Sequence, residues 1–213
     1  MRERTRSVLA LAFNGLAVLA EILWMVLYPG RLVPEVLQWY TYLNNFLGLS
    51  VSLVFVVFAF RELLGYGSVP HFVRTLRWIS CTGLALTFLT VVFLLAPLAG
   101  PDGYGKLMFS GSLLFVHTVC PLLSLIPFLC FERSCAEPGS AWYRDLPLAV
   151  APTGLYILVS VTMNLTRAWH GPYPFLYVYE QPWYASVLWL LFFAAAASGT
   201  ALGLRAVSGL HKR

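Results

Sequence analysis

The chain has 213 residues, of which 59% are hydrophobic and only 11% are charged, and its mean hydropathy is +0.75. This composition excludes an ordinary soluble domain, in which about a quarter of the residues are charged. The net charge of +5 comes from scattered single residues at the ends of apolar runs. That pattern is typical of a membrane surface and not of a nucleic-acid groove.

Six apolar runs follow one another along the chain, each long enough to cross a bilayer at about 20 residues. They cover residues 7–28, 39–60, 75–98, 108–131, 146–166 and 183–205. Short segments rich in Gly and Pro, such as YPG, LGYGSVP and AGPDGYG, separate the runs and are expected to end the helices. The sequence therefore predicts an all-α, polytopic membrane protein, with one domain over residues 1–213 and a bundle of six transmembrane helices.

Basic residues are unevenly shared between the two sides of this predicted bundle. Eleven of the 14 Lys and Arg residues flank the termini, the second loop and the fourth loop. They are Arg2, Arg4, Arg6, Arg61, Arg74, Arg77, Arg133, Arg144, Arg205, Lys212 and Arg213. The other loops carry only Arg31, Lys106 and Arg167. Because basic residues stay on the cytoplasmic side, we expect a multi-pass protein of the cytoplasmic (plasma) membrane with both termini in the cytoplasm.

The sequence contains none of the usual patterns of a metal site or a soluble enzyme. The four cysteines, Cys81, Cys120, Cys130 and Cys135, form no CxxC pair and are interpreted as packing residues. We find no GxSxG elbow, HExxH helix, Walker loop or GxGxxG turn. We therefore expect no metal, no cofactor and no nucleic acid; the lipid bilayer is the expected partner, and the oligomeric state stays open.

A polar stripe opens the second predicted span. Thr41, Asn44, Asn45, Gly48 and Ser52 are spaced i, i+3, i+4, i+7 and i+11, which places them on one face of a helix. Lipid cannot satisfy the hydrogen bonds of such side chains, so the stripe must face protein or a water-filled pocket. In the predicted orientation, its first residues lie in the outer half of the membrane.

Other spans and the fifth loop carry polar or aromatic residues at the same predicted level. His117 lies in the outer half of the fourth span, and the fifth loop reads HGPYPFLYVYEQPWY. The candidate binding residues are Glu21, Asn44, Asn45, Ser160, Asn164, Tyr173 and Phe175. We predict that Thr41, Asn44, His117 and Asn164 line one pocket open to the outer leaflet, with Glu21 nearby.

His117 lies in a helix that a proline disturbs. Pro121 has no N–H, so the carbonyl of His117 loses its helical partner and the span should kink there. An imidazole and a free carbonyl side by side in hydrocarbon need partners from neighbouring spans. A structural role stays open, because Asn, Ser and Thr in membrane helices often serve only as hydrogen-bond contacts between helices. By composition alone, the aromatic loop is more typical of an interfacial belt than of a binding site.

Three segments together resemble the androgen-induced-protein family. They are QWYTYLNN in the second span, LLFVHTVCPLL in the fourth span and YPFL before the last span. That family consists of six-span membrane proteins, and its animal members hydrolyse fatty-acid esters of hydroxy fatty acids with an intramembrane Thr and His. The resemblance implies that Thr41 is the nucleophile and His117 the base of such a hydrolase. The segment GPYPFLYVYEQ is more similar to the bacterial relatives of the family.

The residues are chemically suited to hydrolysis of a lipid-like acyl ester. A neighbouring His can take the proton of a Thr hydroxyl and so make it nucleophilic. Asn44 or Asn45 can donate to a developing oxyanion, and Glu21 can orient the imidazole as the third member of a triad does.

Two other functions stay open. One is a non-catalytic membrane protein that binds or transports a lipid-like small molecule, and the other is a purely structural bundle. A transporter should have a polar track through the inner halves of the spans. There the sequence offers mainly Ser52, Thr82 and Ser198.

Overall fold

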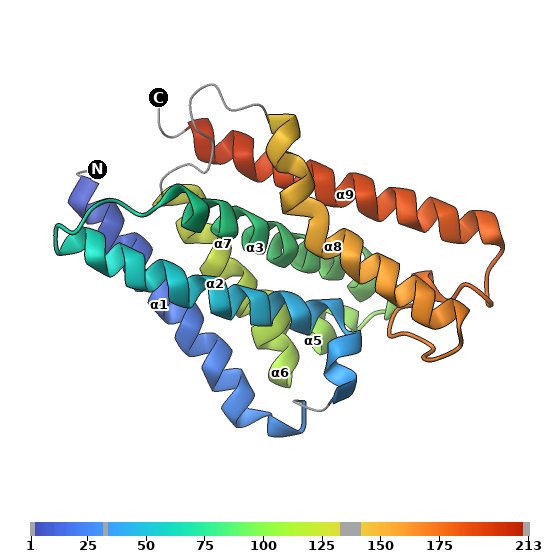
Figure 1. Ribbon diagram of the computed structural model, residues 1–213. Coiled ribbons are helices and arrows are strands. Elements are labelled where there is room, and N and C mark those ends of the chain that lie inside the picture. Colours follow the sequence, from blue (N-terminus) through green and yellow to red (C-terminus); the bar gives the residue numbers. More distant parts are fainter. Residues whose placement is uncertain (1–2, 32–33, 133–141, 211–213) are drawn as a thin grey trace.

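The fold is known from a computed structural model that describes residues 3–31, 34–132 and 142–210 (Figure 1). Within these ranges it consists of helices and their connections, without strands. Six helical runs among the described residues are long and apolar enough to cross a membrane. They are Glu3–Leu27, Tyr40–Leu63, His71–Leu98, Gly111–Cys130, Tyr143–Leu165 and Trp183–Gly209. The predicted all-α class is thereby confirmed; Arg2, Arg133, Cys135, Lys212 and Arg213 lie outside the described residues.

Several helices extend beyond the predicted apolar runs. The chain runs through α1 (Glu3–Leu27), η1 (Pro29–Arg31), η2 (Pro34–Gln38), α2 (Tyr40–Leu63), α3 (His71–Thr90), η3 (Val91–Leu95), α4 (Ala96–Leu98), α5 (Gly103–Met108), α6 (Gly111–Leu114), η4 (Phe115–Val119), α7 (Cys120–Cys130), α8 (Trp142–Leu165), η5 (Pro174–Leu176) and α9 (Trp183–Leu210). Helices α1, α3 and α8 begin before their apolar runs, because long basic side chains can leave the apolar layer while the helical backbone continues.

The two ends of the bundle differ. Both chain termini lie at one end (Figure 1), which we call the termini end. The opposite end, the loop end, holds the segments between α1 and α2, between α3 and α6, and between α8 and α9. Helix α3 is central, because it contacts α2, α7, α8 and α9. In its most apolar stretch 56% of the residues are buried, against 22% in the corresponding stretches of α8 and α9.

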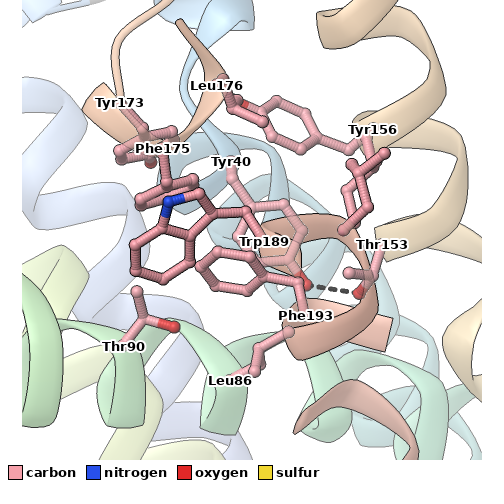
Figure 2. A pocket seen from close by; sticks show the side chains of 12 residues that line it. Tyr40, Leu86, Thr90, Thr153, Tyr156, Tyr173, Phe175, Leu176, Trp189 and Phe193 are labelled. Carbon is pink, nitrogen blue, oxygen red and sulfur yellow. Dashed lines mark hydrogen bonds between the residues drawn. The ribbon is translucent and has the colours of Figure 1, made fainter. Parts of the chain in front are cut away.

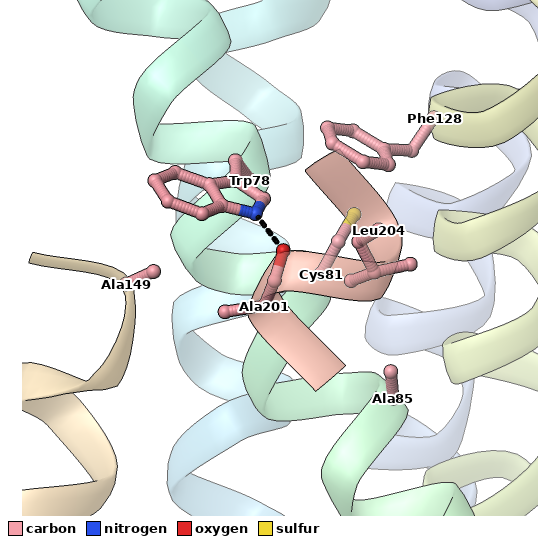
Figure 3. Close-up of a cluster of buried hydrophobic side chains, with 7 residues drawn as sticks. All are labelled: Trp78, Cys81, Ala85, Phe128, Ala149, Ala201 and Leu204. Carbon is pink, nitrogen blue, oxygen red and sulfur yellow. Dashed lines mark hydrogen bonds between the residues drawn. The ribbon is translucent and has the colours of Figure 1, made fainter. Parts of the chain in front are cut away.

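Small side chains let α8 and α9 approach α3 closely. Trp78 of α3 lies in a buried cluster with alanines of the neighbouring helices (Figure 3), and its indole N–H donates to the carbonyl of Ala201 over 2.9 Å. The members of the cluster are Trp78, Cys81, Ala85, Phe128, Ala149, Ala201 and Leu204. Small residues at helix contacts are the usual packing solution in membranes, where burial of apolar surface drives little association.

Prolines mark the two places where the long spans widen into π turns. Pro121 follows His117 by four residues, and the turn around His117 is η4. Pro97 follows Phe93 by the same spacing, and the turn around Phe93 is η3. A proline lacks the N–H that would bond the fourth preceding carbonyl, and its ring crowds that carbonyl, so a wider turn relieves both problems. Both π turns lie toward the loop end.

The half of the bundle nearer the termini end contains a buried ion pair that the sequence analysis missed. Arg77 of α3 contacts Glu132, two residues after the end of α7, over 2.8 Å, and their side chains are 0% and 2% exposed. Arg77 also donates to Ser52 and to the carbonyl of Ser124, while Asn14 donates to Glu132. Arg77 was interpreted only as a flanking positive charge, although its position seven residues into a helix brings it into the core.

The described cysteines differ in their surroundings. Cys81 and Cys120 are buried, as expected of packing residues, whereas Cys130 is exposed. The packing interpretation is therefore wrong for Cys130, whose side chain is not enclosed by the described residues. Cys135 lies outside the described residues.

Candidate active site

A cavity of about 470 Å³ lies at the loop end of the bundle. Its wall comes from η1, η2, the start of α2, the end of the third span, α5, α6, η4 and the loop before α9. The lining residues are Gly30, Val36, Trp39, Thr41, Tyr42, Leu95, Leu98, Ala99, Leu107, Leu113, His117, Pro172, Tyr173 and Pro174. An apolar cavity on which a few polar groups converge is the usual form of a small-molecule site.

Thr41 and Tyr173 bring two hydroxyl groups together on this wall. Thr41 is the second residue of α2, and its Oγ1 lies 3.5 Å from the phenol oxygen of Tyr173 in the loop before α9. Both side chains are buried. The ring of Tyr173 stacks on Phe175 and meets the edge of Trp39, so its position is held on two sides. Burial raises the pKa of Tyr173 to about 12, so its hydroxyl keeps its proton at neutral pH.

His117 is held by the short helix α5. Its Nδ1 lies 2.6 Å from the carbonyl oxygen of Leu107, and the neighbouring Thr118 donates to the carbonyl of Met108. A carbonyl oxygen only accepts, so Nδ1 carries the proton and the Nε2 of a neutral ring is left as an acceptor. His117 is 7% exposed and lines the same cavity as Thr41. This tautomer is the one that general-base chemistry requires.

Gly103 allows α5 to dock where it can hold His117. A Cβ at Gly103 would lie 1.9 Å from the carbonyl oxygen of Ala96, whereas a Cβ at Gly105 of the same helix would meet nothing within 4 Å. Gly103→Ala should therefore displace α5 and lower the thermal midpoint, since overpacking typically costs about 1–3 kcal/mol. Gly105→Ala should leave the midpoint nearly unchanged. Equal midpoints for the two variants in a detergent melting experiment would contradict this docking.

Asn44 and Asn45 act as contacts between helices instead of lining the cavity. Asn44 donates to Thr87 of α3 and lies so close to Gly83 that a Cβ there would be 2.3 Å from its Oδ1. Asn45 donates to the carbonyl of Val116 in the π turn η4. The expectation that Asn44 lines the pocket is wrong, because Asn44 points toward α3. Asn45 uses both N–H groups on the carbonyls of Thr41 and Val116, and Asn44 does not line the cavity, so neither amide is placed to act as the oxyanion donor.

Glu21 lies apart from the imidazole. Its carboxylate accepts from the indole N–H of Trp24, one turn along α1, over 2.7 Å, and it is 2% exposed. Its Oε1 lies 3.7 Å from the Cβ position of Gly48 on α2. Glu21 was considered as the group that orients the imidazole. In the structure the Leu107 carbonyl does this, because it bonds Nδ1 of His117.

Asn164 and Ser160 lie on α8, away from this cavity. The Asn164 amide donates to the carbonyl of His170, and its Oδ1 accepts from the N–H of Val178, so it fastens the loop that follows α8. Ser160 is buried, and its carbonyl accepts from the indole of Trp169. The expectation that Asn164 shares a pocket with Thr41 is therefore wrong. Residues predicted at the same depth of the membrane need not be neighbours, and α8 packs mainly against α3 and α9.

Phe175 belongs to a second, narrower cavity of about 30 Å³, room for roughly one water molecule (Figure 2). Rings from α2, α8, α9 and η5 surround it, and Tyr40 bonds Thr153 across it over 2.6 Å. Tyr173 is the residue that lines both cavities. Within the aromatic loop, Tyr173 and Leu176 are buried in the bundle, whereas Tyr179 and Trp183 are exposed, as in an interfacial belt.

Trp39, Tyr42 and Leu107 are among the cavity residues that the sequence did not point to. Trp39 and Tyr42 belong to the segment QWYTYLNN together with Thr41. Their closeness in sequence to Thr41 is the signal that could have placed them at the cavity. No sequence signal points to Leu107, because it contributes a backbone carbonyl that any residue would supply.

In the described part of the chain, six apolar helices and the cavity that Thr41 and His117 line define a multi-pass membrane protein with a candidate small-molecule site. Comparison of the chain with protein-family models, curated proteins and solved structures found no match.

Proposed function

We propose that this protein is an integral membrane hydrolase of lipid-like acyl esters, with Thr41 as nucleophile and His117 as general base. The observation that carries the proposal is the shared wall of Thr41 and His117 in an apolar cavity large enough for a small amphiphile. The hydrogen bond from Nδ1 of His117 to the Leu107 carbonyl also supports the proposal, because it leaves Nε2 free to accept a proton as a general base does. The resemblance of both segments to the androgen-induced-protein family supports the same assignment.

The reaction would proceed through an acyl-enzyme. Nε2 of His117 takes the proton of Thr41, whose Oγ1 attacks the ester carbonyl carbon, and the leaving alcohol then receives that proton. His117 then takes a proton from a water molecule, whose oxygen attacks the acyl-threonine; the acid is released, and Oγ1 of Thr41 receives the proton back from His117. The apolar wall of the cavity, with Leu95, Leu98 and Leu113, suits the alkyl part of the substrate.

An activity-based probe tests this proposal directly. When the purified protein is incubated with an alkyl fluorophosphonate, Oγ1 of Thr41 should lose its proton and displace fluoride from the probe, so that the protein gains one phosphonyl group. Mass spectrometry of the intact protein and of its peptides would measure this change. Absence of labelling across a panel of acyl-mimicking probes would end the enzyme hypothesis.

A second candidate function is binding or transport of a lipid-like molecule without turnover. The buried polar residues Asn14, Ser52, Arg77 and Glu132 favour it, because they continue the polar interior toward the termini end, where the sequence suggested little. A protein of this kind would bind a fluorescent fatty acid at the cavity, and Thr41→Ala would leave that binding intact, while no ester would be hydrolysed.

We further propose that the termini end faces the cytoplasm, so that the cavity lies toward the outer leaflet. The excess of basic residues at the termini and in the second and fourth loops is the reason. A reporter that is active only in the cytoplasm should therefore give a signal when it is fused after Leu64. A reporter that is active only outside the cell should give a signal when it is fused near Asp102. The reverse pair of signals would contradict the orientation.

A further inference from the structure

The hydrolase proposed above also needs a hydrogen-bond donor that stabilises the negative charge developing on the ester carbonyl oxygen. Such a donor typically contributes two to three orders of magnitude to the rate of acyl transfer. Asn44 and Asn45 were the sequence-based candidates, but their amides bond Thr87 and Val116. The donor must therefore come from another part of the cavity wall.

We propose that the hydroxyl of Tyr173 is this donor and thus a catalytic residue of the same site. Its oxygen lies 3.5 Å from Oγ1 of Thr41, the atom that would attack. In a tetrahedral intermediate the oxyanion is two bonds from the attacking oxygen. A donor at this distance from the nucleophile can therefore reach the oxyanion after a small shift, as often happens when an unliganded site closes on its substrate.

The surroundings of Tyr173 suit a fixed donor. Its side chain is 6% exposed, its ring is parallel to Phe175 with centroids 5.1 Å apart, and Trp39 packs edge-on at 5.7 Å. A ring held on two sides keeps its hydroxyl in place without reorganisation during the reaction, which is what makes an oxyanion donor effective. The raised pKa of the phenol keeps the donor protonated through the neutral range.

The step balances within the residues described. When Oγ1 of Thr41 bonds the acyl carbon, its proton moves to Nε2 of His117, and the π electrons of the carbonyl become the lone pair of the oxyanion. The hydroxyl of Tyr173 donates a hydrogen bond to that oxyanion and keeps its own proton. Collapse of the intermediate re-forms the carbonyl, and the leaving alcohol takes the proton from His117. Tyr173 thus needs no proton transfer of its own.

The role also explains why a loop residue is buried so deeply. Tyr173 comes from the segment between α8 and α9, which Asn164 fastens at two backbone positions, the carbonyl of His170 and the N–H of Val178. These two bonds bracket Tyr173 in the sequence. The loop therefore places the Tyr173 side chain at the start of α2, more than 100 residues away along the chain. There it lies next to Oγ1 of Thr41, the atom that would attack the ester.

The experiment compares Tyr173→Phe with Tyr179→Phe in the purified full chain. Tyr173→Phe keeps the ring contacts and removes the hydroxyl, so kcat for a p-nitrophenyl acyl ester should fall by about 10²–10³-fold. KM should stay near the wild-type value, and labelling by the fluorophosphonate should slow in parallel. Tyr179 lies in the same loop and donates to the carbonyl of Leu165, so Tyr179→Phe should keep the wild-type kcat.

A fluorinated tyrosine at position 173 separates the donor role from a packing role. Fluorination lowers the pKa of the phenol and leaves its size almost unchanged, so the alkaline limb of the pH profile of kcat should move to lower pH. A packing role would leave that limb in place. This variant also serves if Tyr173→Phe fails to fold.

The outcomes distinguish this inference from the proposal on which it rests. Wild-type protein that neither hydrolyses esters nor reacts with the probe would remove the enzymatic function and the Tyr173 role together. An active wild type, with Tyr173→Phe equally fast and an unmoved pH profile for the fluorinated protein, would overturn the Tyr173 role alone.

Discussion

Replacing Thr41 by Ala should abolish labelling by a fluorophosphonate, because no hydroxyl remains at the position that lines the cavity with His117. His117→Ala should slow the labelling by about 10²–10⁴-fold, the usual size of general-base assistance. The measurement is the rate of phosphonyl incorporation, followed by mass spectrometry. Both variants should still fold, since Thr41 makes one long side-chain hydrogen bond and His117 one bond to a backbone carbonyl.

Two controls make the Thr41 result specific. Thr41→Ser keeps a hydroxyl and should retain labelling. Thr153→Ala removes a buried hydroxyl that bonds Tyr40 at the second cavity, and it should label like the wild type. Labelling that persists in Thr41→Ala would move the nucleophile to another hydroxyl, which peptide mass spectrometry would identify.

Loss of the Arg77 side chain should lower the free energy of unfolding by about 3–5 kcal/mol, because Glu132 would keep a buried charge without its cation. Arg77→Met tests this at similar length, and the thermal midpoint in detergent is the measurement. The double variant Arg77→Met with Glu132→Leu should regain much of the loss, because replacing both charges by apolar groups removes the cost of burying them.

A second ion pair of the same bundle provides the control. Arg205 contacts Asp145 over 2.6 Å, but the side chain of Asp145 is 31% exposed. Water screens this pair, so Asp145→Asn should cost only about 1 kcal/mol or less. If Arg77→Met and Asp145→Asn lowered the midpoint equally, burial would not be what makes the Arg77–Glu132 pair important.

The sequence predicted the helices well and the partners of their polar residues poorly. The stripe on α2 was correctly assigned to one face and to contact with protein, because helical periodicity and the lack of hydrogen bonds in lipid act locally. Which neighbour each residue meets was not predictable from spacing. Thr41 meets the cavity, Asn44 meets α3 and Asn45 meets η4, since the helices around α2 differ in direction and distance.

The disturbance near His117 shows the same division between local and tertiary effects. Pro121 was enough to predict an interruption of the helix, because a missing N–H is a covalent property of the residue. The form of the interruption, a π turn whose Val116 carbonyl accepts from Asn45, depends on a partner 71 residues away. The helix α5, which supplies the acceptor for His117, was not foreseen, because it is too short to carry a periodic signal.

By itself, the sequence determined that the chain is apolar, all-helical and able to cross a membrane several times, because composition and the length of apolar runs decide these properties without reference to other segments. The tertiary structure alone decided which polar residues meet. It brought Thr41, His117 and Tyr173 to one cavity, left Asn164 outside it, and joined Arg77 to Glu132 in the core. These pairs are far apart in sequence, and their proximity follows from how the helices pack around α3.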